Sequence, residues 1–278
     1  MTIQLTEELV NSVLPNTIIT VDEEIPLSAR IEPYVKDSIR WLESFVTGDV
    51  DLPPDLEEMA VRAVVLHAVI KAIPSLDLVV TPTGFGVISS SNLVPASKDR
   101  IERLISSLSS SLDDIVLLLQ EKCVSCESWR NSARGRWYCS TFIPYLSDVS
   151  ALRNDNDILP VHTNARGHAL KIETMLAEDY LGYPLMSKLR LGFINGTYDK
   201  SHPVVSAIRA GILRYAAAHS RTAERFRCPD EHEVWHLAEH ILRLVRQDPE
   251  LQTVWENSMN DPFEVEPFKN TRRGGYFF

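Results

Sequence analysis

The sequence contains no long apolar run, no recognisable signal peptide and no excess of positive charge. No apolar stretch approaches the roughly 18 residues that span a bilayer, which excludes a transmembrane protein. The segment Met1–Glu8 lacks the basic region and apolar stretch of a signal peptide, so we expect synthesis in the cytosol. The formal net charge of -10 argues against a protein that coats nucleic acid through bulk charge.

Motifs for phosphate binding, nucleophilic catalysis and structural zinc are also missing. No glycine-rich loop follows a β-prone segment, and no serine or cysteine occupies a strand-to-helix elbow. Cys123 and Cys126 form a CxxC pair, but a zinc ribbon needs a second close pair, and only Cys139 and Cys228 remain. We therefore expect reduced cysteines that pack as small apolar side chains.

Helical periodicity is the strongest pattern that the sequence does contain. Apolar residues recur every three or four positions in several segments, which predicts half-buried helices. These segments are 31–46, 56–73, 101–119, 170–181, 204–217 and 234–245. Pro53-Pro54-Asp55 favours a helix start, and Ser97 has the residue type and position of an N-cap. We predict a mainly α fold, a helical bundle with a short β-hairpin or extended arm. Two related helical halves are one option for its organisation.

The hairpin or arm is expected at 76–92. Two β-prone stretches, Leu76–Thr81 and Phe85–Ser89, flank the turn residues Pro82-Thr83-Gly84. An isolated hairpin is marginally stable in water, so we expect this one to pack on a helix or on a neighbouring subunit. Phe85 is its candidate interface residue.

The patterns divide the chain into four parts. These are a helical subdomain (1–122), an aromatic and arginine-rich connection (123–167), a second helical subdomain (168–260) and an extended tail (261–278). Each half has a helix that ends in a polar stretch with a glycine, Gly48 or Gly182, followed by an alanine-rich helix. An internal duplication explains this match, and so does the general likeness of amphipathic helices.

The sharpest motif is the HExxH string His232-Glu233-Val234-Trp235-His236. Two histidines four residues apart share a helix face and hold zinc in metallopeptidases, where the glutamate activates a water molecule. A zinc-dependent hydrolase that uses His232, His236 and Glu233 as base is therefore the alternative function. The nearest third ligand is His240, one turn further along the same row, and ligands in one row do not readily surround zinc.

Helical phase favours a structural interpretation of the same segment. The apolar positions form one stripe that we expect to face the core, and the histidines project to the opposite side, toward solvent or an interface. The stripe consists of Val234, Leu237, Ala238, Ile241, Leu244 and Val245. We accordingly predict no catalytic residue, no metal and no cofactor.

Arginine and tryptophan alternate in the connection. Arg130, Arg134 and Arg136 lie between Trp129 and Trp137. Such a pattern binds single-stranded nucleic acid in some proteins and forms protein interfaces in others. Because the chain is acidic, we favour the interface; an arginine face in solvent with tryptophan anchors in the core is the third option.

The C-terminal segment combines basic and aromatic residues. Lys269, Arg272 and Arg273 precede Gly274-Gly275 and the aromatic run Tyr276, Phe277 and Phe278. Three aromatic side chains in water would form an exposed apolar patch, so we expect them to dock on a partner or a neighbouring copy. Fraying in solvent is the alternative.

The stretch Ile73–Ser89, continued by Asn92–Ile101, resembles a family of proteins encoded in the structural modules of tailed phages and prophages of gut bacteria. The helix, polar step and alanine-rich helix before it are similar to head–tail connector (adaptor) proteins, which ring the portal in the phage neck. This resemblance implies a virion protein that forms a ring-shaped homo-oligomer and contacts portal and neck or tail proteins. It implies no membrane contact, no active site, and nucleic acid only as DNA that passes through a channel.

Overall fold

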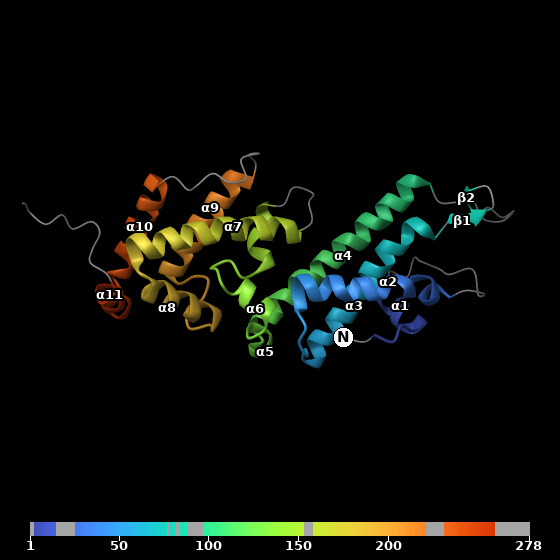
Figure 1. Ribbon diagram of the computed structural model, residues 1–278, viewed down its shortest axis with the longest axis horizontal. Helices are drawn as coiled ribbons and strands as arrows, with labels where there is room; N and C mark the ends of the chain where they lie inside the picture. The colour runs from blue at the N-terminus through green and yellow to red at the C-terminus, as the bar shows by residue number, and fades with distance from the viewer. Residues whose placement is uncertain are drawn as a thin grey trace, which may run out of the picture. The chain divides into compact units, whose positions relative to one another are not determined.

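The computed structural model describes residues 3–14, 26–76, 78–81, 84–87, 97–152, 158–220 and 231–258. The described part is mainly helical, as the periodicity predicts (Figure 1). The chain forms two compact units, Met1–Asn164 and Ala165–Phe278, so that most of the expected connection belongs to the first. Within the described residues, no helix combines the length and the apolar character required to cross a bilayer.

In the described part of the first unit, four helices form its body. They are α1 (Glu7–Val13), α2 (Leu27–Leu42), α3 (Pro54–Ala72) and α4 (Lys98–Ser125). The last three confirm the helices predicted at 31–46, 56–73 and 101–119. Helix α2 continues into a π-helical turn, η1 (Glu43–Thr47), and α3 into a 3-10 turn, η2 (Ile73–Ser75). Trp41 of α2 stacks on His67 of α3 with ring centroids 4.1 Å apart, which joins these two helices.

The predicted hairpin is present between α3 and α4. Strands β1 (Leu78–Thr81) and β2 (Gly84–Val87) pair antiparallel, with Leu78 opposite Val87 and Thr81 opposite Gly84. Figure 1 shows the two strands at the end of the helix pair that they join. Among the described residues these strands form a sheet of two.

The aromatic connection contains short helices where the sequence shows no clean period. They are α5 (Glu127–Arg130), α6 (Ala133–Tyr138) and the 3-10 segment η3 (Leu146–Leu152). Two buried polar side chains fix the loop between α6 and η3. Gln120 of α4 donates to the Pro144 carbonyl at 2.7 Å and accepts from the Leu146 amide at 3.0 Å. A ring nitrogen of His162 lies 3.0 Å from the Ile143 carbonyl.

The second unit repeats the helical character of the first. Its elements are α7 (Ile158–Leu176), which begins before the boundary, the π-helical turn η4 (Ala177–Leu181), α8 (Tyr183–Ile194), α9 (Pro203–Ser220), α10 (Glu231–Val245) and α11 (Pro249–Glu256). The helices predicted at 170–181, 204–217 and 234–245 are confirmed. Helix α8 occupies a stretch expected to connect helices; Pro184 fits there because the first turn needs no amide from it.

The two units share an unusual turn. In each, a long helix widens into five π-helical residues and ends at a glycine with positive φ, 71° at Gly48 and 77° at Gly182. In each, a tryptophan indole N–H donates to the carbonyl two residues before that glycine. Trp129 donates to Val46 at 3.0 Å, and Trp255 donates to Tyr180 at 3.1 Å.

Four buried positions of one helix and five of another recur at the same spacing in both units, although α7 buries further residues that have no counterpart in α2. The helix before each turn buries Ile31, Val35, Ser38 and Leu42 in one unit and Ala165, Ala169, Ile172 and Leu176 in the other, at equal distances from the glycine. The helix before each tryptophan shares five buried positions, Leu112, Val116, Leu119, Gln120 and Cys123 in α4 and Val234, Ala238, Ile241, Leu242 and Val245 in α10; α4 buries Leu108 and Val124 in addition. The spacing along the chain is identical in each pair of sets. The helices of the two units therefore face their cores in the same phase.

Candidate functional site

The arginine and tryptophan segment binds the end of α2. Three side chains from α5 and α6 donate to three consecutive carbonyls of the turn η1. Arg134 donates to Ser44, Tyr138 donates to Phe45 at 2.8 Å, and Trp129 donates to Val46 at 3.0 Å. A helix leaves its last carbonyls without partners inside the helix, so these three donors cap the turn from a distant part of the chain. We call this arrangement the turn clasp.

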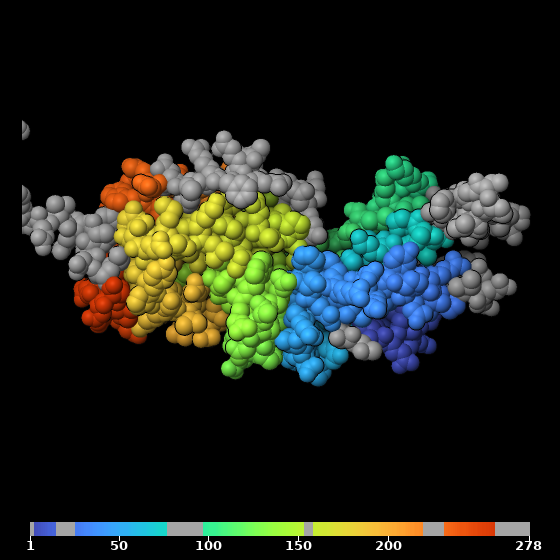
Figure 2. Space-filling model, viewed as in Figure 1, coloured from blue at the N-terminus to red at the C-terminus, as the bar shows by residue number. Residues whose placement is uncertain are grey.

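Two glycines allow the turn clasp to close. At Gly48, the φ of 71° lies in the left-handed region that side chains with a Cβ rarely adopt. At Gly135, an added Cβ would lie 1.9 Å from the Trp129 carbonyl oxygen, so only glycine lets α6 approach α5. Figure 2 shows the segment of α5 and α6, in light green, directly against the blue end of α2.

The structure corrects the expectation that Trp129 contacts a partner. Its side chain is fully buried in the core of its own unit, so the indole is not available to another molecule. Arg134 donates to the Ser44 carbonyl, and Arg130 donates to the Val124 carbonyl at 3.2 Å, so both guanidinium groups bind backbone of their own unit. Trp129 is thus an anchor in the core, as the third interpretation of this segment predicts, and Gly135 is the residue in the sequence that permits the close approach.

Two residues of the same segment remain at the surface. Arg136 is exposed, and Trp137 is half-buried. The Trp137 ring packs edge-on against Tyr138 with centroids 4.8 Å apart, and the Arg134 guanidinium lies over it at 5.3 Å. Burial raises the pKa of Tyr138 well above its usual range, so its hydroxyl stays protonated as the donor to Phe45. Arg136 and Trp137 are the candidates of this set that a partner can reach.

The HExxH residues lie on the outer side of α10. His232, Glu233 and His236 are all exposed, as is His240, while Val234, Ala238, Ile241 and Val245 are buried. This confirms the predicted phase of the helix. The rings of His232 and His236 are 4.4 Å apart between centroids and nearly perpendicular. Within the described ranges, no group of three or more histidine, cysteine, aspartate or glutamate side chains is placed to hold a metal ion.

The three cysteines in the described part of the chain carry no disulfide and differ in acidity. Burial raises the pKa of Cys123 to about 12 and that of Cys139 to about 11. For Cys126, partial burial acts in the same direction. However, the hydroxyl of Ser128 and the backbone amides of Ser128 and Trp129 stabilise its thiolate, and the resulting pKa is below its ordinary value. The fourth, Cys228, lies outside the described residues.

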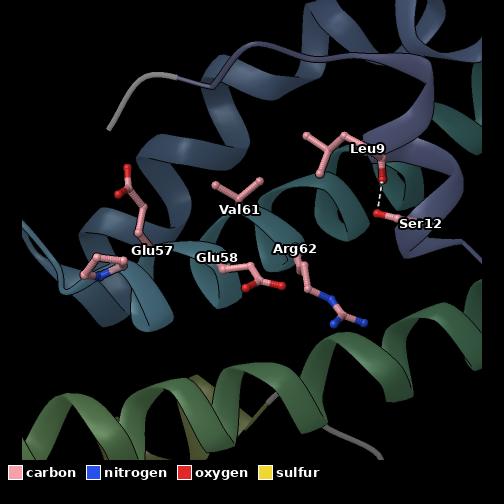
Figure 3. A pocket seen from close by; sticks show the side chains of 7 residues that line it. Leu9, Ser12, Glu57, Glu58, Val61 and Arg62 are labelled. Carbon is pink, nitrogen blue, oxygen red and sulfur yellow. Dashed lines mark hydrogen bonds between the residues drawn. The ribbon is translucent and has the colours of Figure 1, made fainter.

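A groove that the sequence analysis missed lies between α1 and α3. Its volume is about 390 Å³, and Leu9, Ser12, Pro54, Glu57, Glu58, Val61 and Arg62 line it. Figure 3 shows Leu9 of α1 facing Val61 of α3, and Glu57 and Glu58 extending from α3 in different directions. Amphipathic helices commonly carry exposed acidic residues, so the sequence does not predict this groove. The groove forms because α1 packs beside α3.

An acidic cavity of about 450 Å³ adjoins this groove through Glu57. Its other carboxylates belong to Glu43, Asp49 and Asp51, and follow the end of α2. We call the two openings together the acidic groove. Like charges of this density favour a cationic partner.

Two further candidates depend on parts of the chain that are only partly described. Phe85 lies in β2 opposite Val80, and the structure describes the backbone at this position. The aromatic run Tyr276, Phe277 and Phe278 lies outside the described residues.

A family model matches part of the first unit. DUF6712, a family of unknown function, matches residues 35–137. The match begins in α2 and ends in α6, and so includes the turn η1, the hairpin and the tryptophan and arginine of the turn clasp. No curated protein matches the chain, and no solved structure matches it.

Proposed function

We propose that this chain is a structural protein of a phage virion, a head–tail connector or adaptor subunit that assembles into a ring on the portal. Support comes first from the resemblance of residues 73–101 to proteins of phage structural modules. A helical body with a hairpin between two of its helices is suited to a subunit that contacts its neighbours. In this proposal, the partners are further copies of the chain, the portal and neck or tail proteins, and the location is the virion neck.

The hairpin is the observation that carries the proposal. Strands β1 and β2 have four residues each, and within the described ranges they pair with one another alone. A hairpin of this length is marginally stable by itself, and its outer edges offer unpaired backbone groups. A neighbouring subunit that covers the hairpin would supply the missing contacts. Rings of identical subunits use such head-to-tail contacts.

The negative net charge of the chain is compatible with a ring through which DNA passes. The net charge of -10 gives a surface that does not retain a polyanion, so DNA would pass such a ring without binding to it.

Native mass spectrometry of the purified chain, with negative-stain electron microscopy, tests the proposal. We expect closed multimers of the 31.4 kDa chain, formed alone or on addition of portal protein. Phe85→Ser should reduce assembly, while Leu118→Ser, which removes an exposed leucine of α4, should not. A chain that remains monomeric with and without portal protein would contradict the proposal.

The same spectra test the alternative, a zinc-dependent hydrolase. That alternative requires one tightly held zinc ion per chain, lost in the variant His236→Ala. Because His232 and His236 are exposed, the variants His232→Ala and His236→Ala should fold like the wild type. Stoichiometric zinc that disappears in either variant would favour the hydrolase over the connector.

A further inference from the structure

The acidic groove and the C-terminal segment have complementary chemistry. Five carboxylates surround the two openings, those of Glu43, Asp49, Asp51, Glu57 and Glu58, with Arg62 as the cation among the lining residues. The last ten residues of the sequence, 269–278, contain Lys269, Arg272 and Arg273, no aspartate or glutamate, and three aromatic residues. We infer that the segment 269–278 of a second copy of this chain binds in the acidic groove of the first unit.

The shape of the groove supports this occupant. The part between α1 and α3 has apolar walls from Leu9 and Val61, and its volume of about 390 Å³ is in the range of sites that hold aromatic ligands. The adjoining cavity is the more acidic of the two. A segment with cations and aromatics a few residues apart matches both parts, with rings between Leu9 and Val61 and cations beside the carboxylates.

Both ends of the segment contribute favourable contacts in the groove. Burial of aromatic side chains in an apolar cleft is favourable, and so are ion pairs between arginines and carboxylates. Aromatic and arginine residues contribute much of the binding energy at protein interfaces. Charge complementarity also makes the contact sensitive to salt, since the groove acids Glu57 and Glu58 are exposed. The inference concerns self-association of the chain and goes beyond the proposed place in the virion.

A charge-exchange experiment on the full chain tests it. One variant reverses the groove, with Glu57→Lys and Glu58→Lys, and a second reverses the segment, with Arg272→Glu and Arg273→Glu. We expect each variant alone to self-associate about tenfold or more weakly than the wild type in sedimentation equilibrium. A mixture of the two should regain association, because the unaltered groove of the segment variant then meets the unaltered segment of the groove variant, and the reversed groove meets the reversed segment.

A matched control carries the same change of charge elsewhere. Asp114→Lys with Glu121→Lys alters two exposed acids of α4 that do not line the groove, and should associate like the wild type. Three results would each overturn the inference. The wild type could be monomeric, the groove variant could associate as strongly as the wild type, or the mixture could stay dissociated. If the protein is monomeric and the reversals change only its stability toward unfolding, the segment binds the groove of its own chain, and the inference is wrong. Rings that form despite these reversals would leave the connector proposal standing.

A second inference comes from the paired turns and does not depend on the first. The two units share the π-helical turn, the glycine with positive φ, the distant tryptophan donor and the spacing of buried residues in the helices on either side. We also infer that the units are two copies of one helical module. The tryptophan lies six residues after Cys123 in one copy and ten after Val245 in the other, a difference of about one helical turn.

Exchange of the turns tests the second inference. Residues 177–181 are replaced by the sequence of 43–47, Glu-Ser-Phe-Val-Thr, in the full chain. If the modules are equivalent, Trp255 should still bind the carbonyl at position 180, which hydrogen exchange and near-ultraviolet circular dichroism report. The control replaces the same residues with five alanines, which favour a regular α-helix over the widened turn. An exchanged chain that loses structure as far as the alanine control does would contradict the inference.

Discussion

The indole of Trp129 and the carbonyl of Val46 are joined by a hydrogen bond of 3.0 Å across 83 positions of the sequence. The bond is buried, and it fixes the short helix α5 to the end of α2. Because Tyr138 and Arg134 bind the two preceding carbonyls, the turn clasp decides how the helical body and the aromatic connection of the first unit fit together.

Replacing Trp129 with phenylalanine should destabilise the first unit. The ring keeps much of its apolar contact, but the buried Val46 carbonyl loses its donor. We expect a loss of about 2 kcal/mol in the free energy of unfolding. Urea titration followed by far-ultraviolet circular dichroism measures it. Trp235→Phe is the matched control, since this indole is half-buried, and an equal loss in both variants would contradict the role of the hydrogen bond.

Alanine at Gly48 should also be unfavourable. Its φ of 71° is strained for any residue with a Cβ, and Arg134 Cβ lies 3.1 Å from where the new atom would be. We expect a cost of about 1–2 kcal/mol. Gly167→Ala provides a control with the opposite sign, because this exposed residue of α7 has open space around it and should gain about 0.5–1 kcal/mol. Thermal unfolding of both variants gives the comparison.

Cys126 should be the most reactive of the three described cysteines. Its pKa is lowered, so its thiolate forms at lower pH than that of an ordinary cysteine, whereas the pKa values of Cys123 and Cys139 are raised to about 12 and about 11. Iodoacetamide labelling at a series of pH values, with Cys228→Ser to remove the fourth thiol, measures the order by mass spectrometry. Labelling of Cys126 should begin below the usual cysteine range of about pH 8.5. Faster labelling of Cys123 in the folded chain would contradict this order.

The variant Gln120→Met should loosen the loop between α6 and η3. Methionine has a similar volume, but it leaves the Pro144 carbonyl and the Leu146 amide without their buried partner. We expect a loss of about 3 kcal/mol, from two hydrogen bonds, and faster hydrogen exchange at Leu146. Protection at Leu146 equal to that of the wild type would show that the glutamine does not hold the loop.

Periodicity predicted the helices because they bury one side. The stripe on α10 and the outward histidines followed from a rotation of about 100° per residue, and both are present. The hairpin was predicted because Pro82-Thr83-Gly84 is a strong turn signal between β-prone stretches.

Features that depend on distant residues were not predicted. The sequence favours Trp129 as an interface residue, because no neighbouring residue indicates that a turn 83 positions earlier needs a hydrogen-bond donor. The π-helical turns had no local signature except the glycines that end them. The part of the acidic groove between α1 and α3 arises only where the two helices meet, and neither helix contains it alone.

The turn clasp also sets an order of events during synthesis. The end of α2 leaves the ribosome long before the tryptophan, arginine and tyrosine that satisfy its carbonyls, and these three residues lie between positions 129 and 138. Since chains fold as they emerge, the first unit cannot complete its fold until Tyr138 has left the ribosome. A nascent chain arrested shortly before Trp129 should therefore be protease-sensitive at the end of α2, and one arrested well beyond Tyr138 should be resistant.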